Sequence, residues 1–146
     1  MSTINFDMDG TIANLYADPN WLPRLRAHDA SVYANAAPLV DMAQLARLLN
    51  ALQEKGHRLA VISWLSKDKD PAFEVEVSKV KMEWLSVQLP SVRWDSINIV
   101  SYGTPKGNFG TAEDILFDDE QQNRENWPGT AYDVDNILEI LRGLLK

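Results

Sequence analysis

Two carboxylates near the N-terminus, Asp7 and Asp9, have the spacing of a catalytic or metal-binding pair. They follow the apolar stretch 4–6 and precede Gly10. Alternate residues of a strand share a face, and Gly10 allows a turn just past Asp7, so both side chains could enter one crevice at the carboxyl end of the strand. Ligands bind at this end of open α/β sheets. Because two close carboxylates repel each other, the pair requires a cation or a shared proton, and Mg²⁺ is the natural partner.

The run Asp7-Met8-Asp9-Gly10-Thr11 resembles the DxDGT signature of the haloacid dehalogenase-like (HAD) phosphohydrolases. A calcium loop or a tight turn with an aspartate cap could carry the same letters. Its place directly after an apolar strand favours the family. An acid at Asp9 also argues against dehalogenation, because the dehalogenase branch of the family lacks an acid at that position.

A second acidic pair, Asp118 and Asp119, follows another short apolar run. It resembles the fourth HAD motif, in which two acids complete the Mg²⁺ site with the first aspartate. A helix cap formed by these acids and Glu120 is the simpler alternative. The resemblance implies that Asp119 is the direct ligand and that Asp118 lies behind it, although the two could exchange roles.

Two further residues occupy the places where HAD enzymes bind the phosphoryl group. Ser63 ends the apolar run 57–63, and Lys106 lies in a glycine-rich loop that lacks the Walker pattern. Ser66 is an alternative for the serine, and Lys67 and Lys69 are weaker alternatives for the lysine. The phosphate-binding residues expected from the resemblance are Ser63, Lys106, Gly10 and Thr11.

The resemblance implies a Mg²⁺-dependent phosphatase that works through an aspartyl-phosphate. Asp7 would be the nucleophile, and Asp9 would be the general acid and base. Mg²⁺ would be held by Asp7, the backbone carbonyl of Asp9, and the acidic pair Asp118 and Asp119.

Strands must place these residues at one edge of a sheet, and helices must join the strands. The predicted helices are 39–55, capped by Asp41, 71–89, starting at Pro71, and a last helix capped by Asp135. Strands are predicted near residues 4–7, 57–63, 97–101, 114–117 and 130–134. Alternating strands and helices predict an α/β fold with a parallel sheet. The resemblance implies a Rossmann-like HAD core with strand order 5-4-1-2-3 and helices on both faces.

Helix 71–89 carries an apolar stripe that predicts core packing. Its charged side chains are expected on the solvated face. The stripe is Phe73, Val77, Val80, Trp84 and Val87, and the charged residues are Glu74, Glu76, Lys79, Lys81 and Glu83.

Residues 12–38 lie where HAD enzymes insert a cap, and their length predicts only a minimal cap or flap. Tyr16, Trp21 and Tyr33 could stack on a base or sugar, although rings of this kind more often pin a loop to the core. The chain is similar to the cytosolic 5′(3′)-deoxyribonucleotidase group in its first motif and in the short path from Lys106 to the acidic pair. That group has a larger helical insert, so its nucleotide specificity is left open here.

Composition predicts one globular domain over residues 1–146, with 45% hydrophobic and 24% charged residues. No apolar run has the length of a membrane span, and no cysteine is available for a disulfide, a zinc site or a nucleophile. The start of the chain lacks signal-peptide features, so a cytoplasmic location is expected. The net charge of −7 argues against an extended nucleic-acid surface.

The expected partner is a small phosphorylated substrate, with a nucleotide as the leading choice. Two other readings stay open: a phosphatase of nucleic-acid ends or phosphoproteins, and a HAD-fold binding or regulatory protein without turnover.

Overall fold

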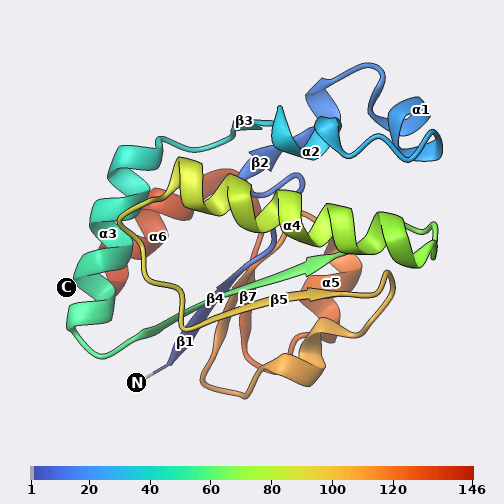
Figure 1. Cartoon of the computed structure of the whole chain (residues 1–146). Helices are drawn as coiled ribbons and strands as arrows, with labels where there is room; N and C mark the ends of the chain where they lie inside the picture. Colours follow the sequence, from blue (N-terminus) through green and yellow to red (C-terminus); the bar gives the residue numbers. More distant parts are fainter. Residues whose placement is uncertain (1) are drawn as a thin grey trace.

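A five-stranded parallel sheet lies at the centre of the computed structural model, which describes residues 2–146 (Figure 1). Its strands lie in the order β5-β4-β1-β6-β7, and every neighbouring pair is parallel. Numbered among themselves along the chain, these strands have the predicted order 5-4-1-2-3, read from the opposite edge. The strands are β1 (Thr3–Phe6), β4 (Arg58–Trp64), β5 (Ser96–Val100), β6 (Ile115–Phe117) and β7 (Thr130–Tyr132).

The central strand β1 pairs with β4 on one side and with β6 on the other. Phe6 lies opposite Val61 of β4 and Phe117 of β6 in the register of the sheet. The amide of Asp7 continues this pairing by donating to the carbonyl oxygen of Phe117 over 3.0 Å. Residues that follow β1 and β6 therefore emerge side by side at the carboxyl edge of the sheet, as the parallel order requires.

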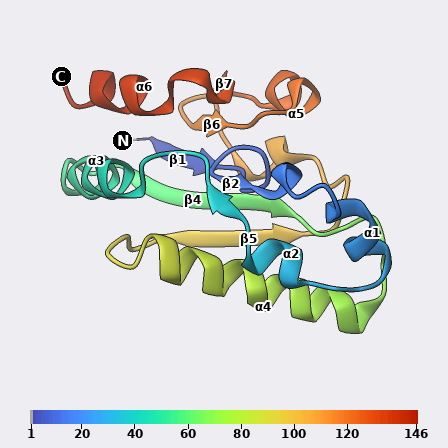
Figure 2. The ribbon, with the colours of Figure 1, turned by 90° about the horizontal axis from the view of Figure 1, so that it is seen from above.

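Helices α3 (Met42–Glu54), α4 (Pro71–Gln88) and α6 (Ile137–Leu144) cover one face of the sheet (Figures 1 and 2). Asp41 caps α3 through the amide of Gln44, and Asp70 caps α4 just before Pro71. The predicted Asp41 cap and the Pro71 start are confirmed, although α3 begins at Met42 rather than at residue 39. On the opposite face, Ile62 and Leu116 pack against Trp127, which follows α5 (Gln121–Asn126). Helices on both faces were expected, and this arrangement confirms them.

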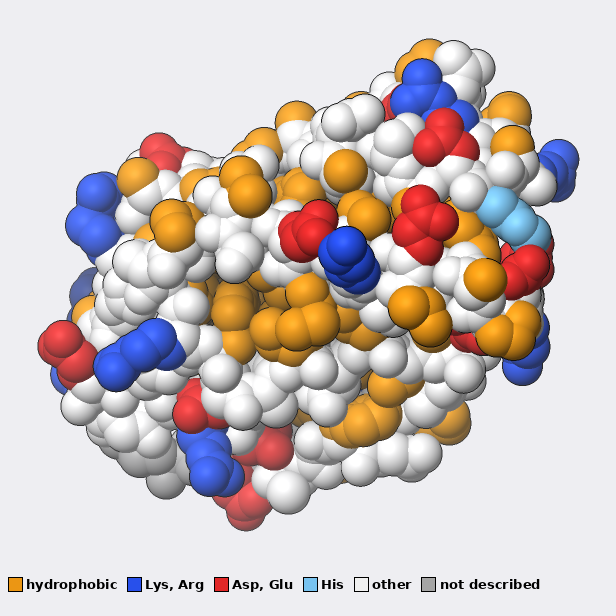
Figure 3. Space-filling model, in the orientation of Figure 1, with side chains coloured by type: hydrophobic (Ala, Val, Ile, Leu, Met, Phe, Trp, Pro, Cys, Tyr) orange, Lys and Arg blue, Asp and Glu red, His pale blue; other side chains and the backbone are white. Residues whose placement is uncertain are grey.

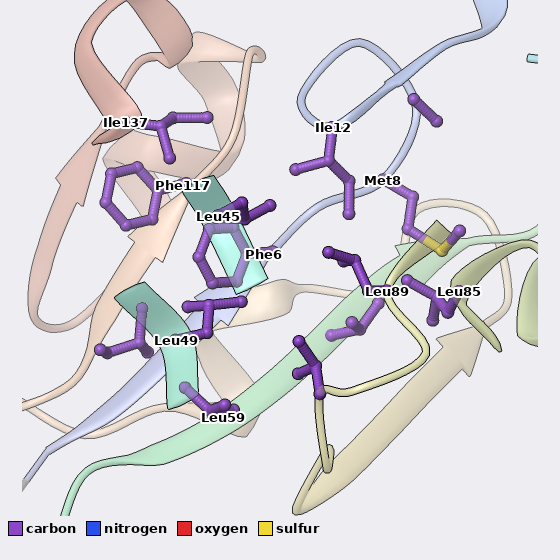
Figure 4. Packing of buried hydrophobic residues seen from close by; sticks show 14 of the residues in the cluster. Phe6, Met8, Ile12, Leu45, Leu49, Leu59, Leu85, Leu89, Phe117 and Ile137 are labelled. Atoms are coloured by element: carbon purple, nitrogen blue, oxygen red, sulfur yellow. The ribbon is translucent and has the colours of Figure 1, made fainter. Parts of the chain in front are cut away.

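The main core fills the space between the sheet and α3, α4 and α6. Phe6 stacks on Phe117 with ring centroids 5.1 Å apart. Leu45 and Leu49 of α3 and Leu85 of α4 belong to the same buried cluster, which Figure 4 shows around the two rings. This packing fixes the positions of β1 and β6, whose ends carry the acidic residues.

An insert leaves the sheet after β1 and returns before α3. Its two ends pair as a small antiparallel sheet of β2 (Ala13–Asn14) and β3 (Ala37–Pro38). Between them lie the 3₁₀ turn η1 (Leu15–Ala17) and two short helices, α1 (Trp21–Arg26) and α2 (Ser31–Ala34). Val32 and Tyr33 of α2 pack with Phe73 and Val77 of α4 in a second buried cluster. The insert therefore sits on α4 beside the carboxyl edge of the sheet (Figure 1).

Three sequence-based assignments on the helices were wrong. Val87 was expected in the core but is 74% exposed, and Leu85 is buried in its place. Lys81 was expected on the solvated face but is only 1% exposed. Asp135 does not cap the last helix, because Asp133 caps the preceding 3₁₀ turn η3 (Val134–Asn136), and α6 starts directly after it.

The outer side of α4 keeps several apolar side chains at the surface. Val75 and Met82 are more than half exposed, and Figure 3 shows hydrophobic side chains over α4 and the neighbouring edge strand β5. Within residues 2–146, no helix has both the length and the apolar character needed to cross a membrane.

Candidate active site

Asp7 and Asp9 lie on a tight turn that begins directly after β1. The carbonyl oxygen of Met8 accepts the amides of Thr11, Ile12 and Ala13 over 2.9–3.1 Å, which closes the turn. Gly10 has a φ of +83°, which favours glycine. A Cβ atom at Gly10 would lie 2.4 Å from Oδ2 of Asp119, so a side chain there would displace that carboxylate.

Lys106 holds the carboxylate of Asp7. It opens the 3₁₀ turn η2 (Lys106–Phe109) between β5 and β6, and it is only 2% exposed. Its Nζ donates to Oδ1 of Asp7 over 2.8 Å and to Oδ2 of Asp118 over 2.7 Å. Burial by itself lowers the pKa of a lysine, but the two carboxylates outweigh it and raise the pKa of Lys106 above its ordinary value. The predicted juxtaposition of this lysine with Asp7 is therefore present in the fold.

The two acids after β6 have different surroundings. Asp118 is fully buried; its Oδ2 accepts from Lys106 and from the amide of Asn123, and its Oδ1 accepts the backbone amide of Glu120. Asp119 is partly exposed and is contacted by the hydroxyl of Thr11 over 3.3 Å. Asp119 therefore has more free oxygen lone pairs than Asp118.

Burial and then mutual repulsion raise the pKa values of both acids after β6. Burial, followed by the charge of Asp7, raises the pKa of Asp118 to about 6. Burial and the neighbouring Asp7 and Asp118 carboxyls raise the pKa of Asp119 to about 8. Lys106 contacts Asp7 and Asp118, but one lysine does not compensate the negative charge of three carboxylates at this edge.

The acids fit a hard divalent cation. Oxygen atoms of Asp7, Asp118 and Asp119 lie within 4.8 Å of one another. Carboxylate oxygens are the protein ligands that Mg²⁺ prefers, and the raised pKa values show that added positive charge would be favourable. Both oxygens of Asp118 already accept hydrogen bonds from the protein, whereas within residues 2–146 Asp119 accepts only from the hydroxyl of Thr11, so Asp119 is better suited than Asp118 to hold the ion directly.

Lys81 is a second buried lysine at this site, and sequence reasoning missed it. Its Nζ donates to Oδ2 of Asp9 over 2.9 Å and to Oγ of Ser63 over 2.7 Å. The available signal was its spacing: Lys81 follows Val77 by four residues and precedes Trp84 by three, so it lies on the buried stripe of α4. Burial, supported by the charge of Asp7, raises the pKa of Asp9 even though Lys81 acts in the opposite direction.

The other predicted phosphate-binding groups lie near the acids, but their polar atoms have partners within the protein. Ser63 is buried beside Lys81, whereas its alternative Ser66 lines the adjoining cavity. The hydroxyl of Thr11 donates to Oδ2 of Asp7 over 3.0 Å, and the amide of Gly10 donates to the carbonyl oxygen of Ala13. Phosphate contact by these residues stays a prediction.

A cavity of about 590 Å³ opens directly above Asp7, Asp9 and Lys106. The insert supplies much of its wall, and the loops after β4 and β5 supply most of the rest. The predicted aromatic residues all line it, and sequence reasoning missed two more rings: the aromatic lining is Tyr16, Trp21, Tyr33, Trp64 and Tyr102. The cavity therefore joins the acids to an aromatic chamber.

The rings differ in how they are held. Tyr16 is 46% exposed and meets Trp21 edge-to-face, with centroids 5.0 Å apart. Tyr33 is buried, with its ring 4.8 Å from Nζ of Lys81. Trp64 donates its indole N–H to the carbonyl oxygen of Thr104, and its ring packs against Tyr102. Tyr16 is therefore the most exposed of these rings, Tyr102 follows at 40%, and Trp21 is partly buried.

Two alternatives considered for Lys106 lie apart from the acids. Lys67 is exposed at the cavity mouth, with its Nζ 5.2 Å from the centroid of the Tyr102 ring. Lys69 is also exposed and does not line the cavity. The structure therefore favours Lys106 over both as the cation beside Asp7.

Comparisons with known proteins agree with this geometry at the level of the fold. No family model matches the sequence, and no curated protein matches it. Among solved structures, the chain is similar to a D,D-heptose 1,7-bisphosphate phosphatase from Burkholderia thailandensis, a HAD-family phosphatase, with 11% sequence identity and a TM-score of 0.59. The match covers 100% of this chain and 99% of the other. Together with the strand order, this full-length match shows that the chain has the haloacid dehalogenase-like fold.

Proposed function

We propose that the protein is a Mg²⁺-dependent phosphatase of phosphomonoesters and that nucleoside monophosphates are its preferred substrates. The observation that carries the proposal is the carboxylate of Asp7. It lies at the floor of the cavity, where Lys106 and Thr11 hold one oxygen each. A carboxylate held in this way beside a set of acids suited to a metal is oriented for nucleophilic attack.

In the first half of the proposed reaction, an oxygen of Asp7 attacks phosphorus and the bond from phosphorus to the ester oxygen breaks. Asp9 donates a proton to that oxygen as it leaves. The raised pKa of Asp9, which arises first from its burial, favours the protonated form that this step needs. The products of this half are an alcohol and an aspartyl-phosphate at Asp7.

In the second half, water attacks the phosphorus of the aspartyl-phosphate, and Asp9 takes the proton that water loses. Inorganic phosphate leaves and Asp7 is restored. Lys106 contacts Asp7, and its positive charge would offset the negative charge of the phosphoryl group.

Mg²⁺, held by Asp7, Asp119 and the backbone carbonyl of Asp9, would supply positive charge to the phosphoryl oxygens. Asp118 would hold Lys106 and Asn123 in place rather than coordinate the ion directly. The net charge of −7 makes this local positive charge necessary for an anionic substrate.

The chamber supports a nucleotide as the substrate. Its volume lies within the range of small-molecule sites, roughly 300–1,000 Å³. Tyr16 and Trp21 offer rings for a base, and Arg26 and Lys67 add positive charge to the lining. The wall formed by the insert, our proposed minimal cap over residues 12–38, favours a small substrate over a nucleic-acid end or a phosphoprotein.

Phosphate release from a panel of nucleoside monophosphates, sugar phosphates, a 5′-phosphorylated oligonucleotide and a phosphopeptide tests this proposal. The assay is run with Mg²⁺ and with EDTA. We expect turnover only with Mg²⁺ and the highest kcat/KM for nucleoside monophosphates. Faster release from the oligonucleotide or the peptide would contradict the substrate assignment, and no release from any ester would favour a binding protein.

The Trp21→Ala variant tests the base-stacking part separately. Loss of one stacked ring should raise KM for nucleoside monophosphates by roughly 5- to 150-fold, on the scale of about 1–3 kcal/mol for a base on an aromatic ring. KM for a sugar phosphate should change little. Equal changes for both substrates would show that Trp21 shapes the insert rather than binds a base.

A further inference from the structure

Lys81 projects from the middle of α4 into the region beneath the cavity floor. Its Nζ has three acceptors: Oδ2 of Asp9 at 2.9 Å, Oγ of Ser63 at 2.7 Å and the carbonyl oxygen of Trp64 at 2.7 Å. An ammonium group has three N–H donors, so all three are used. The ring of Tyr33 lies 4.8 Å from the same nitrogen.

These contacts join parts of the protein that are far apart in the sequence. Asp9 follows β1, Ser63 and Trp64 end the neighbouring strand β4, and Tyr33 belongs to the insert. Through one buried atom, Lys81 therefore links the turn after β1, the end of β4 and the insert.

Stability alone is a weak reason for a lysine at this position. A buried ion pair contributes little net stability compared with an apolar residue of similar size, because both charges lose water. Neighbouring positions on the same stripe are filled by Val77 and Trp84. A methionine could fill the space of Lys81, but it could not hold the carboxylate of Asp9.

Each of the two buried lysines contacts a different aspartate of the first acidic pair. Lys106 contacts Asp7, and Lys81 contacts Asp9. With Oδ2 of Asp9 bound to Lys81, its Oδ1 has no hydrogen-bond partner within residues 2–146, and Asp9 lines the cavity. One oxygen is thus anchored and the other is left for the substrate.

We propose that Lys81 is a positioning residue that holds the carboxyl group of Asp9 toward the oxygen of the leaving group. The inference rests on the proposed function, because it assigns Lys81 a part in that reaction. Lys81 itself transfers no proton. The proton moves from Asp9 to the ester oxygen as the bond to phosphorus breaks, and Lys81 fixes the carboxyl group from which it moves.

A comparison of leaving groups tests this role. A nucleoside monophosphate leaves as an alkoxide that needs a proton, whereas p-nitrophenyl phosphate leaves as a stable phenolate that does not. In Lys81→Met, we expect kcat for the nucleoside monophosphate to fall by about 10²-fold or more, the scale of general acid catalysis. For p-nitrophenyl phosphate, kcat should fall by less than about 10-fold, because that step needs little help from a general acid.

The ratio of the two rates is measured in one preparation, so a partly unfolded variant does not change it. Lys79→Met, on the same helix but exposed, serves as the matched control and should leave the ratio unchanged. In an Asp9→Asn background, Lys81→Met should cause no further change in the ratio, since the residue it positions is already disabled.

The outcomes separate this inference from the proposed function. Equal losses on both substrates, or a further fall in the ratio in the Asp9→Asn background, would overturn the positioning role while leaving the phosphatase intact. No turnover of either substrate by the wild-type protein would overturn both. A selective loss on the nucleoside monophosphate that disappears with Asp9→Asn would support the role of Lys81.

Discussion

Lys106→Met should destabilise the fold strongly, because Lys106 is the positive partner of two buried acids. Its Nζ lies 2.8 Å from Asp7 and 2.7 Å from Asp118, whose side chains are 10% and 0% exposed. Removing one partner of a buried ion pair costs about 3–5 kcal/mol. For a domain of this size, where 1 kcal/mol shifts Tm by roughly 2–4 °C, the expected fall in Tm is about 6–20 °C.

Urea and thermal unfolding in EDTA measure this loss without a metal contribution. The double variant Lys106→Met/Asp118→Asn should recover part of it, because the amide of asparagine needs no cation. We expect a coupling free energy of about 1–3 kcal/mol between the two changes.

The exposed Lys79→Met is the matched control. Lys79 and Glu83 lie 4.0 Å apart, and both side chains are mostly exposed. Lys79→Met should therefore change the free energy of unfolding by no more than about 0.5 kcal/mol. The electrostatic reasoning would be refuted if Lys106→Met cost no more than this control, or if its effect and that of Asp118→Asn were additive.

Three further predictions concern the same edge of the sheet. The pKa of Asp119 is raised to about 8, whereas an aspartate in the unfolded chain has a pKa near 4. Between these two pH values, Asp119 keeps its proton in the folded protein and loses it in the unfolded chain. Stability from this group without metal should therefore fall between about pH 4 and pH 8, and Mg²⁺ should raise Tm more at pH 8 than at pH 6; a larger rise at pH 6 would contradict this. Gly10→Ala should cost about 1–2 kcal/mol for the positive φ and should weaken Mg²⁺ binding in calorimetry by displacing Asp119; unchanged affinity would count against the metal site. His28 donates a hydrogen bond to the carboxylate of Asp68, which raises the pKa of His28, so this pair should stabilise the insert while His28 is protonated and lose its effect as pH rises past that pKa. NMR titration of His28 should show a lower pKa in Asp68→Asn, and an unchanged pKa would argue against the contact.

The acids could be predicted from the sequence because each pair follows a short strand with buried apolar residues, and Lys106 was expected from the resemblance to HAD enzymes. In a parallel sheet the carboxyl ends of the strands meet at one edge, so strand order alone brings Asp7 and Asp118 together. The turn at Gly10 could also be predicted, because a sharp turn after the first strand requires a residue that tolerates a positive φ.

Lys81 could not be assigned in this way, because its burial depends on distant residues. A lysine among other charged residues on a helix is usually solvated, and only the arrival of Asp9 and Ser63 from two other elements makes its burial tolerable. The spacing to Val77 and Trp84 was informative, but a sequence pattern cannot supply the acceptors.

The insert was also only partly predictable. Its length and aromatic content were visible, but β2 and β3 contain two residues each and exist because the chain leaves and re-enters the core at neighbouring points. Trp64 reaches the cavity from the end of β4 and Tyr102 from the loop after β5, and no local pattern marked them as lining residues.

The most direct test of the account is phosphate release with Mg²⁺ by the wild-type protein and by Asp7→Asn, together with acid-quench trapping of a phosphorylated protein. We expect the wild type to release phosphate and to form an acyl-phosphate at Asp7, and we expect the variant to do neither. Equal release by both proteins would contradict the role of Asp7 as the nucleophile and, with it, the proposed mechanism.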